Sequence, residues 1–228
     1  MVKAKWLYSE LPLSLDQITT LLLAEQYSDD KGEGFLLSSS GKQFLSGRYI
    51  EKTIGRSIVI DPFGNQSEQE TVAYYTCKFS WQNGSKLLCI TEPPRSLRKF
   101  LAKLHSLLGL GVVIADITID PLEWLQKIES QLGITTITHI SSFGIHTPVG
   151  GLAKISVSGK KDIRTDFDEL ISNRRHKVEN VKFNLIYNND IKASVELTRA
   201  GNCKLKSYNH NEILDKFRLC LEGIVADN

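Results

Sequence analysis

The stretch that decides the fold runs from Val72 to Leu108 and reads VAYYTCKFSWQNGSKLLCITEPPRSLRKFLAKLHSLL. Every second side chain from Ala73 to Trp81 is apolar, and the residues between them are mostly polar, which is typical of a strand with one buried face. The dipeptide Asn83-Gly84 follows, and it tolerates the positive φ angles of a tight turn better than most pairs. We therefore predict a hairpin whose second strand runs from Lys86 to Thr91.

A helix is predicted directly after this hairpin. Pro93-Pro94 ends the second strand, because proline cannot donate to a sheet ladder, and helical periodicity then extends from Arg95 to Leu108. One side of this helix is apolar, and no acidic residue occurs between Arg95 and Ala115. Two interpretations of the other side stay open, a surface that contacts phosphates and a solvated face with charges near a helix end. That side carries Arg95, Arg98, Lys99 and Lys103.

The remaining elements follow from the same patterns. Residues 61–70 indicate a polar, net acidic loop. We predict an α+β fold of largely antiparallel, hairpin-connected sheets with about five helices. It forms either two lobes, residues 1–133 and 134–228 with a soft boundary, or a single domain. Strands are predicted at 2–8, 35–39, 44–52, 56–60, 109–119, 134–145, 152–157, 178–187, 191–199 and 203–208, and helices after Ser14, Asp120, Asp162 and Asn211.

The composition is that of an ordinary globular protein. Of the 228 residues, 41% are hydrophobic and 24% are charged, and the net charge is +2, so neither a disordered chain nor a strongly basic nucleic-acid coat is indicated. No apolar run is long enough to cross a bilayer, and Met1–Glu10 lacks the apolar segment of a signal peptide. The cysteines are widely spaced, which predicts reduced thiols in a cytoplasmic protein. They are Cys77, Cys89, Cys203 and Cys220.

No motif indicates a phosphate loop, a zinc site or an activated nucleophile. Gly109-Leu110-Gly111 lacks the lysine and the third glycine of a phosphate-binding loop. Ser96-Leu97-Arg98-Lys99 lacks the partner motifs of a serine nucleophile. His139 and His146 are seven residues apart, which places them on opposite faces of one strand. We therefore predict no catalytic residue, no metal and no cofactor.

A metal-dependent nuclease is kept as the weakest alternative. Such an enzyme needs carboxylates that converge on a metal beside a lysine. Asp190 with Glu196, and Asp116 with Asp120, are the two pairs that the sequence offers. Neither pair has a lysine at a matching spacing, and Asp120 is expected to cap a helix.

Further cations flank the helix that begins after Asp162. We interpret them either as a second patch that contacts phosphates or as basic, solvated turns. Lys160, Lys161 and Arg164 lie at the start of this helix, and Arg174 and Arg175 lie at its end.

The middle of the chain resembles part of the recombination-associated RdgC proteins. The likeness rests on the hairpin with Trp81, the sequence Leu87-Leu88-Cys89-Ile90, the helix Ser96–Leu108 and the strand Val112–Ile119. These segments match in layout and in hydrophobic pattern.

The end of the chain is similar to the RexA phage exclusion proteins. The helix Asp162–Ser172, the strands from Val181 to Tyr208 and the closing helix from Asn211 carry this likeness. Together the two resemblances cover about two thirds of the chain, from Tyr74 onward. They imply a homodimer that binds duplex DNA without sequence preference, in phage–host conflict or recombination.

The leading hypothesis is a cytoplasmic, non-catalytic accessory protein that binds nucleic acid, with duplex DNA favoured and no membrane partner. The alternative is an interaction subunit of a multi-protein complex whose partner carries the enzyme activity. That subunit would dock through exposed sheet edges and the acidic loop 61–70. For the leading hypothesis, the phosphate contacts are assigned to Arg95, Arg98, Lys99 and Lys103, with a second patch at Lys160, Lys161, Arg164, Arg174 and Arg175.

Overall fold

The computed structural model describes residues 1–147, 149–172, 174–187 and 191–227. Within these residues the chain forms five helices and eleven strands, and every strand pair in the assigned registers is antiparallel. The predicted α+β fold with hairpin-connected strands is therefore confirmed. The chain divides into two compact units, which we call the N-terminal unit (residues 9–114) and the C-terminal unit (residues 1–8 and 115–228).

These units differ from the two lobes predicted at 1–133 and 134–228. That prediction places the helix α3 (Pro121–Leu132) in the first lobe, but α3 packs against the strands and the last helix of the C-terminal unit. Residues 2–5 pair with residues 202–205 and so join the same unit. The division therefore follows long-range packing and not the order of the chain.

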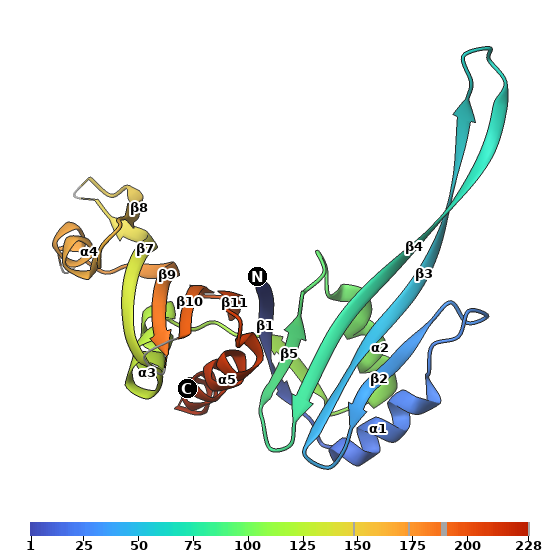
Figure 1. Ribbon diagram of the computed structural model, residues 1–228, viewed down its shortest axis with the longest axis horizontal. Helices are drawn as coiled ribbons and strands as arrows, with labels where there is room; N and C mark the ends of the chain where they lie inside the picture. The colour runs from blue at the N-terminus through green and yellow to red at the C-terminus, as the bar shows by residue number, and fades with distance from the viewer. Residues whose placement is uncertain (148, 173, 188–190, 228) are drawn as a thin grey trace. The chain divides into compact units, whose positions relative to one another are not determined.

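The N-terminal unit is a four-stranded antiparallel meander covered by two helices (Figure 1). The predicted turn at Asn83-Gly84 is confirmed, because Gly84 has φ +76° and Ser85 donates its backbone N–H to the carbonyl of Gln82 at 3.1 Å. The strand order is β2-β3-β4-β5. Its elements are α1 (Leu15–Ala24), β2 (Glu33–Ser40), β3 (Phe44–Ile60), β4 (Gln66–Gln82), β5 (Leu87–Thr91) and α2 (Arg98–Leu108).

An aromatic cluster forms the core of this unit. Phe100 of α2 stacks on Phe79 of β4 with ring centroids 5.3 Å apart, and it also contacts Tyr49 of β3 at 6.2 Å. All three side chains are at most 2% exposed. Burying rings of this size contributes a large part of the stability of a small unit. The alternation around Phe79 therefore predicts correctly which side of β4 faces the helices.

Strands β3 and β4 are longer than the sequence predicts. The sequence predicts separate strands at 44–52 and 56–60 and an acidic loop at 61–70, but β3 continues through Gly55 and β4 begins at Gln66. Cross-strand pairs hold this extension together, and the Arg56 guanidinium lies 2.9 Å from the Glu70 carboxylate. The turn is confined to 61–65, where the Asp61 carboxylate accepts from two backbone N–H groups. The loop prediction is therefore wrong for 66–70.

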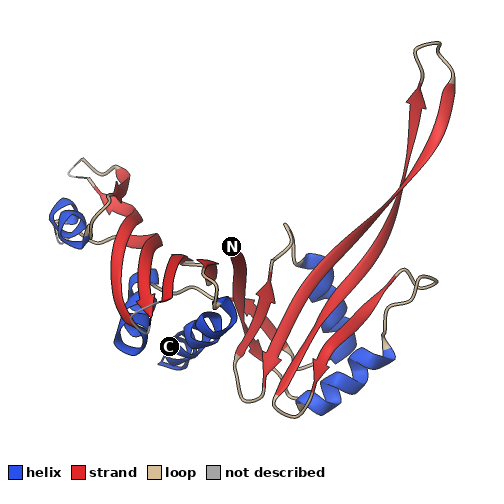
Figure 2. Ribbon diagram, in the orientation of Figure 1, coloured by secondary structure: helices blue, strands red, loops and turns tan. Residues whose placement is uncertain are grey.

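The C-terminal unit places its helices against an antiparallel sheet with the strand order β1-β11-β10-β9-β7-β8 (Figure 2). The boundaries between the two units fall within strands β1 and β6, so each of these strands has residues in both units. The other elements of this unit confirm the predicted helices and the β9–β11 meander. The bounds are β1 (Val2–Glu10), β6 (Val113–Asp116), β7 (Gly133–His146), β8 (Leu152–Ser158), α4 (Arg164–Ile171), β9 (Lys177–Tyr187), β10 (Ile191–Thr198), β11 (Asn202–Lys206) and α5 (His210–Asp227).

Local chemistry explains where two helices start. Asp120 caps α3 by accepting the backbone N–H of Leu122 at 2.8 Å, as predicted. Helix α2 begins at Arg98 and not at Arg95, and its N-cap residue Leu97 offers no side-chain acceptor.

The strand predicted at 109–119 shortens to β6, because Gly109 and Gly111 adopt positive φ angles of 77° and 89°.

Candidate nucleic-acid interface

Two of the four cations assigned to α2 are held by carboxylates. Lys99 Nζ lies 2.5 Å from a Glu51 carboxylate oxygen. Lys103 Nζ lies 2.7 Å from Glu33 and 3.1 Å from Glu25. Both ammonium groups therefore have carboxylate partners, because β2, β3 and the end of α1 bring acidic residues to them.

The Lys103 pair is a structural ion pair. The hydrogen bond between Glu33 and Lys103 is the largest cause that lowers the pKa of Glu33. The same bond raises the pKa of Lys103. Both groups therefore stay charged at neutral pH, and the Lys103 side chain is only 21% exposed. A phosphate would have to displace two carboxylates to reach this ammonium group.

Arg95, Arg98 and Lys99 are exposed, but Lys99 is held by Glu51. No ion pair involves either guanidinium within the described part of the chain. Two of the four cations assigned to phosphate contacts therefore have no carboxylate partner among the described residues.

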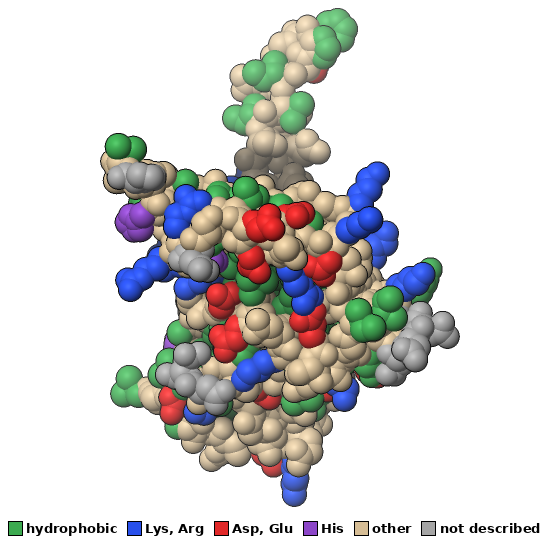
Figure 3. All heavy atoms as spheres, turned by 90° about the vertical axis from the view of Figure 1, so that its left-hand side faces the viewer, with side chains coloured by type: hydrophobic (Ala, Val, Ile, Leu, Met, Phe, Trp, Pro, Cys, Tyr) green, Lys and Arg blue, Asp and Glu red, His purple; other side chains and the backbone are tan. Residues whose placement is uncertain are grey.

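The second predicted patch is also dispersed. Arg164 forms an ion pair with Glu129 and a hydrogen bond to Thr135 Oγ1 at 2.7 Å. Arg174 donates to the backbone carbonyls of Leu170 and Ile171, and so caps the end of α4. Figure 3 shows cations and carboxylates interspersed over the visible side of the molecule. Lys160, Lys161 and Arg175 are exposed, and this patch belongs to the C-terminal unit whereas α2 belongs to the other.

The C-terminal sheet has a second face that its helices do not cover. The Trp124 ring of α3 lies 5.4 Å from the Trp6 ring of β1, and α3 and α5 also pack on β7, β9 and β11. Phe167 of α4 lines a cavity on the same side together with Ile137. Side chains alternate between the two faces of a strand. The residues between these buried positions therefore face away from α3, α4 and α5.

Lysines dominate this uncovered face, which we call the lysine face. Register places Lys3 of β1 directly opposite Lys204 of β11, and Glu196 of β10 opposite both Lys204 and Lys182 of β9. Lys192 and Lys206 are exposed, and neither forms an ion pair among the described residues. The lysine face consists of Lys3, Lys5, Thr136, Lys182, Asn184, Lys192, Ser194, Glu196, Lys204 and Lys206. Register also places Asn180, Thr198, Asn202 and the two exposed isoleucines Ile134 and Ile186 on the same side of the sheet.

Two carboxylates offset part of this charge. Glu196 lies 2.9 Å from Lys204 Nζ and 3.7 Å from Lys182 Nζ, and Asp116 of β6 lies 2.7 Å from Lys5 Nζ. Counted over these side chains alone, six lysines and two carboxylates carry a formal net charge of +4. Burial opposes ionisation of Glu196, but its bonds to Lys204 and the charges of both lysines outweigh burial and lower its pKa. Glu196 is therefore a fixed negative charge at neutral pH.

His139 of β7 lies at one edge of the lysine face, where it pairs in register with Lys182. Burial is the largest cause that lowers the pKa of His139, and the charge of Lys182 adds to it. The imidazole is therefore neutral at pH 7, and its Nδ1 lies 2.7 Å from Ser158 Oγ. His139 contributes a polar group and not a charge.

The N-terminal unit repeats this arrangement on a smaller scale. Arg48 of β3 and Lys78 of β4 are register partners, and both are exposed. They lie on the strand faces opposite to Tyr49 and Phe79, which face the helices.

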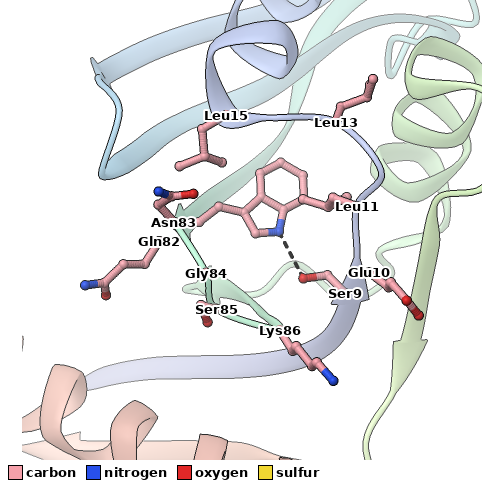
Figure 4. A pocket seen from close by; sticks show the side chains of 11 residues that line it. Ser9, Glu10, Leu11, Leu13, Leu15, Gln82, Asn83, Gly84, Ser85 and Lys86 are labelled. Atoms are coloured by element: carbon pink, nitrogen blue, oxygen red, sulfur yellow. Dashed lines mark hydrogen bonds between the residues drawn. The ribbon is translucent and has the colours of Figure 1, made fainter.

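A pocket of about 240 Å³ lies beside the β4–β5 turn in the N-terminal unit (Figure 4). The Trp81 indole donates to Ser9 Oγ at 3.2 Å at its floor, and both residues are buried. Lys86 and Glu10 are its charged lining residues. The hydrogen bond between Trp81 and Ser9 connects the end of β1 to the turn. The lining of the pocket includes one basic residue, Lys86, and so is not a cationic site.

The described carboxylates among those considered for a nuclease have other partners. Asp190 lies outside the described residues, and Glu196 is held by two lysines. Asp116 pairs with Lys5, and Asp120 caps α3. Across the described residues, no three His, Cys, Asp or Glu side chains gather as metal ligands would.

Sequence reasoning missed the lysine face although part of its signal is visible. Lys3 and Lys5 alternate with buried residues, as do Lys204 and Lys206. The pairing that makes them neighbours joins the two ends of the chain, and no local pattern shows it.

Comparison with models of protein families and with curated proteins finds no match to this chain. The resemblance to RdgC and RexA proteins therefore stays a prediction. Among the described residues, no helix combines the length and the apolar character needed to span a membrane.

Proposed function

We propose that this protein binds duplex DNA without catalysing a reaction, and that the lysine face makes the phosphate contacts. The observation that carries this proposal is the helix-free sheet face on which six lysines from four neighbouring strands gather. The proposal keeps the predicted ligand and moves its site from α2 to the sheet.

The arrangement of the lysines supports a polyanionic ligand. Lys3 and Lys204 are directly opposite each other, and like charges in this position destabilise a sheet. Adjacent strands are about 4.8 Å apart, so the ammonium groups form a dense array. Phosphates that neutralise these groups release counterions, and this release drives most binding to DNA.

The chemistry of the face favours a duplex over a single strand. Single-strand binding usually relies on aromatic rings that stack on bases, and the lysine face as defined contains no aromatic residue. Its Asn184, Ser194 and Thr136 side chains are groups that commonly contact the phosphate backbone. Contacts of this kind position DNA without reading its sequence, so sequence-independent binding is expected.

The net charge sets the expected salt dependence. Four neutralised phosphates give a slope of log K against log salt of about −3.6, because each contributes about −0.9. Affinity should then fall by about 10²-fold between 50 and 200 mM salt.

Fluorescence anisotropy of a labelled duplex, measured over this salt range, tests the proposal with two matched variants. Lys192→Gln with Lys206→Gln removes two exposed charges from the lysine face, and Arg95→Gln with Arg98→Gln removes two exposed charges from the start of α2 and the segment just before it. The first variant should reduce the slope by about 1.8 and weaken binding about 60-fold at 100 mM salt, whereas the second should behave as wild type. The proposal is refuted if the wild-type protein binds no duplex at 50 mM salt. Equal losses in the two variants would remove the lysine face as the site.

Homodimerisation, a cytoplasmic location and a role in phage–host conflict or recombination remain predictions. Binding by the isolated, purified chain would separate the leading hypothesis from that of an interaction subunit. An interaction subunit is expected not to bind duplexes even at low salt. Any residual binding should not depend on the lysines of the lysine face.

A further inference from the structure

Strands β3 and β4 continue as a two-stranded arm beyond the rest of their sheet (Figure 1). The last partner of β3 on β2 is Glu51, and the pairing of β4 with β5 reaches only to Lys78. We define the arm as residues 53–73. Apart from half-buried Asp61, every residue of the arm is exposed.

The two faces of the arm differ in character. Cross-strand partners share a face, so register groups Ile54 with Val72, Arg56 with Glu70, and Ile58 with Glu68. Thr53, Gly55, Ser57, Val59, Gln69, Thr71 and Ala73 lie on the opposite face and are mostly small or polar. We call the first face, with Ile60 and with Tyr74 at its base, the apolar arm face. Its large apolar side chains are 49–67% exposed: Ile54 55%, Ile58 67%, Ile60 61%, Val72 49% and Tyr74 55%.

An arm of this kind is unfavourable in water by itself. An isolated two-stranded ribbon is only marginally stable without a third strand or a packed face. Five half-exposed large side chains present on the order of 500 Å² of surface, at the upper end of what a monomeric protein leaves in contact with water. The apolar arm face is therefore expected to be covered by a partner.

The charges of the arm select the kind of partner. One cation, Arg56, stands against three carboxylates, Asp61, Glu68 and Glu70, so the arm has a net charge of −2 and repels a phosphate backbone. The apolar arm face nevertheless carries both signs, because Arg56 lies between the levels of Ile54 and Ile58. Glu68 has no ion pair within the described residues. Arg56 donates its Nε–H to Glu70 of its own chain at 2.9 Å, which leaves its terminal guanidinium N–H groups for Glu68 of a second copy. With its apolar side chains, this face therefore complements a copy of itself.

We propose that the apolar arm face binds the same face of a second copy of this chain in a two-fold dimer. In a two-fold interface, a residue i of one copy that contacts residue j of the other implies that residue j of the first copy contacts residue i of the second. Antiparallel arms related by an axis between the Arg56 and Ile58 levels bring Arg56 to the level of Glu68 of the second copy. The same arrangement brings Ile54 and Val72 to the level of Ile60 of the second copy.

The size of the face sets the expected strength. Including polar neighbours, two such faces bury roughly 1,200 Å² in total, which is the lower limit for specific, stable interfaces. Dimers of this size commonly dissociate in the micromolar range, on the order of 1–10 µM. Wild-type protein should therefore change from monomer to dimer over a range of concentrations that sedimentation can follow.

Sedimentation velocity of the full chain from 1 to 200 µM tests the proposal. Ile58→Glu places a charge in the apolar arm face and should weaken the dimer at least 10-fold. Ser57→Glu adds the same charge one residue away, on the opposite face, and should leave the dimer intact. Wild-type protein that stays monomeric up to 200 µM overturns the proposal, and so does an equal response to the two substitutions.

A charge exchange identifies the occupant as a second copy. Arg56→Glu and Glu68→Arg should each give a monomer, because like charges then meet across the two-fold axis. An equimolar mixture of these two variants should form dimers, since two carboxylates of one chain then face two guanidinium groups of the other. A mixture that stays monomeric while wild type dimerises overturns the pairing of these levels. Circular dichroism of each exposed-site variant confirms that the fold is retained.

Discussion

Removing the carboxylate at the centre of the lysine face should strengthen DNA binding while it weakens the fold. Glu196 holds Lys204 at 2.9 Å and Lys182 at 3.7 Å. Glu196→Gln keeps the shape of the side chain, raises the local net charge by one and releases both ammonium groups. Each additional phosphate contact steepens the salt slope by about 0.9. At 100 mM salt this corresponds to about 8-fold tighter binding for one contact and about 60-fold for two.

The effect on stability has the opposite sign. The three side chains are 21%, 44% and 49% exposed, and partly exposed ion pairs contribute about 0.5–1 kcal/mol. The folded state lowers the pKa of Glu196 below its ordinary value of 4.5. Its contribution is therefore present above pH 4.5 and is lost as the pH falls through the folded-state pKa. Wild type and Glu196→Gln should differ by about 0.5–1 kcal/mol at pH 7 and converge at low pH, as measured by urea denaturation.

Anisotropy titrations with a labelled duplex provide the assay, and Glu51→Gln is the matched control. Glu51 holds Lys99 of α2 at 2.5 Å, so its loss would strengthen binding if α2 were the DNA surface. We expect tighter binding for Glu196→Gln and none of this gain for Glu51→Gln. Unchanged or weaker binding by Glu196→Gln would contradict the proposed role of the lysine face, and a gain confined to Glu51→Gln would return the site to α2.

Two further predictions concern the fold. Gly201 has φ +67°, and a Cβ there would lie 2.4 Å from Ile117 Cδ1, so Gly201→Ala should cost about 2 kcal/mol or more. Gly150, with φ +84° and no atom near its Cβ position, is the control, and its replacement by alanine should cost about 1 kcal/mol by thermal or urea denaturation. Lys103→Met should destabilise the protein by about 1 kcal/mol at pH 7, because Glu33 loses the hydrogen bond that lowers its pKa. Measured by denaturation, this difference in stability should shrink as the pH falls below 4.5 and through the lowered folded-state pKa of Glu33. A loss of stability that persists once Glu33 is protonated would contradict the ion pair as its cause.

Local patterns predict much of the fold. The alternation up to Trp81 identifies β4, Asn83-Gly84 identifies its turn, and Asp120 marks the start of α3. Each of these features depends on a few neighbouring residues, whose backbone preferences and apolar period are visible in the sequence. The prediction fails at Gly55 and at 66–70, where pairing across two long strands outweighs a glycine and a polar composition.

The candidate site is less predictable because charge acts through space. The sequence shows four cations in α2 and just before it, but only the folded chain brings Glu51 to Lys99 and two carboxylates to Lys103. Neutralisation of this kind depends on side-chain distances of a few ångströms between elements that are far apart in the chain.

Local sequence therefore specifies the secondary structure around the central hairpin, the α+β class and the position of the helix that follows the hairpin. Long-range packing selects which cations are available, because the β1–β11 pairing gathers lysines from both ends of the chain onto one uncovered face. It also makes β3 and β4 extend as an arm, since residues that pair across two strands stabilise each other only when both strands are present. Backbone preference is local, whereas burial and electrostatic pairing are properties of the folded chain.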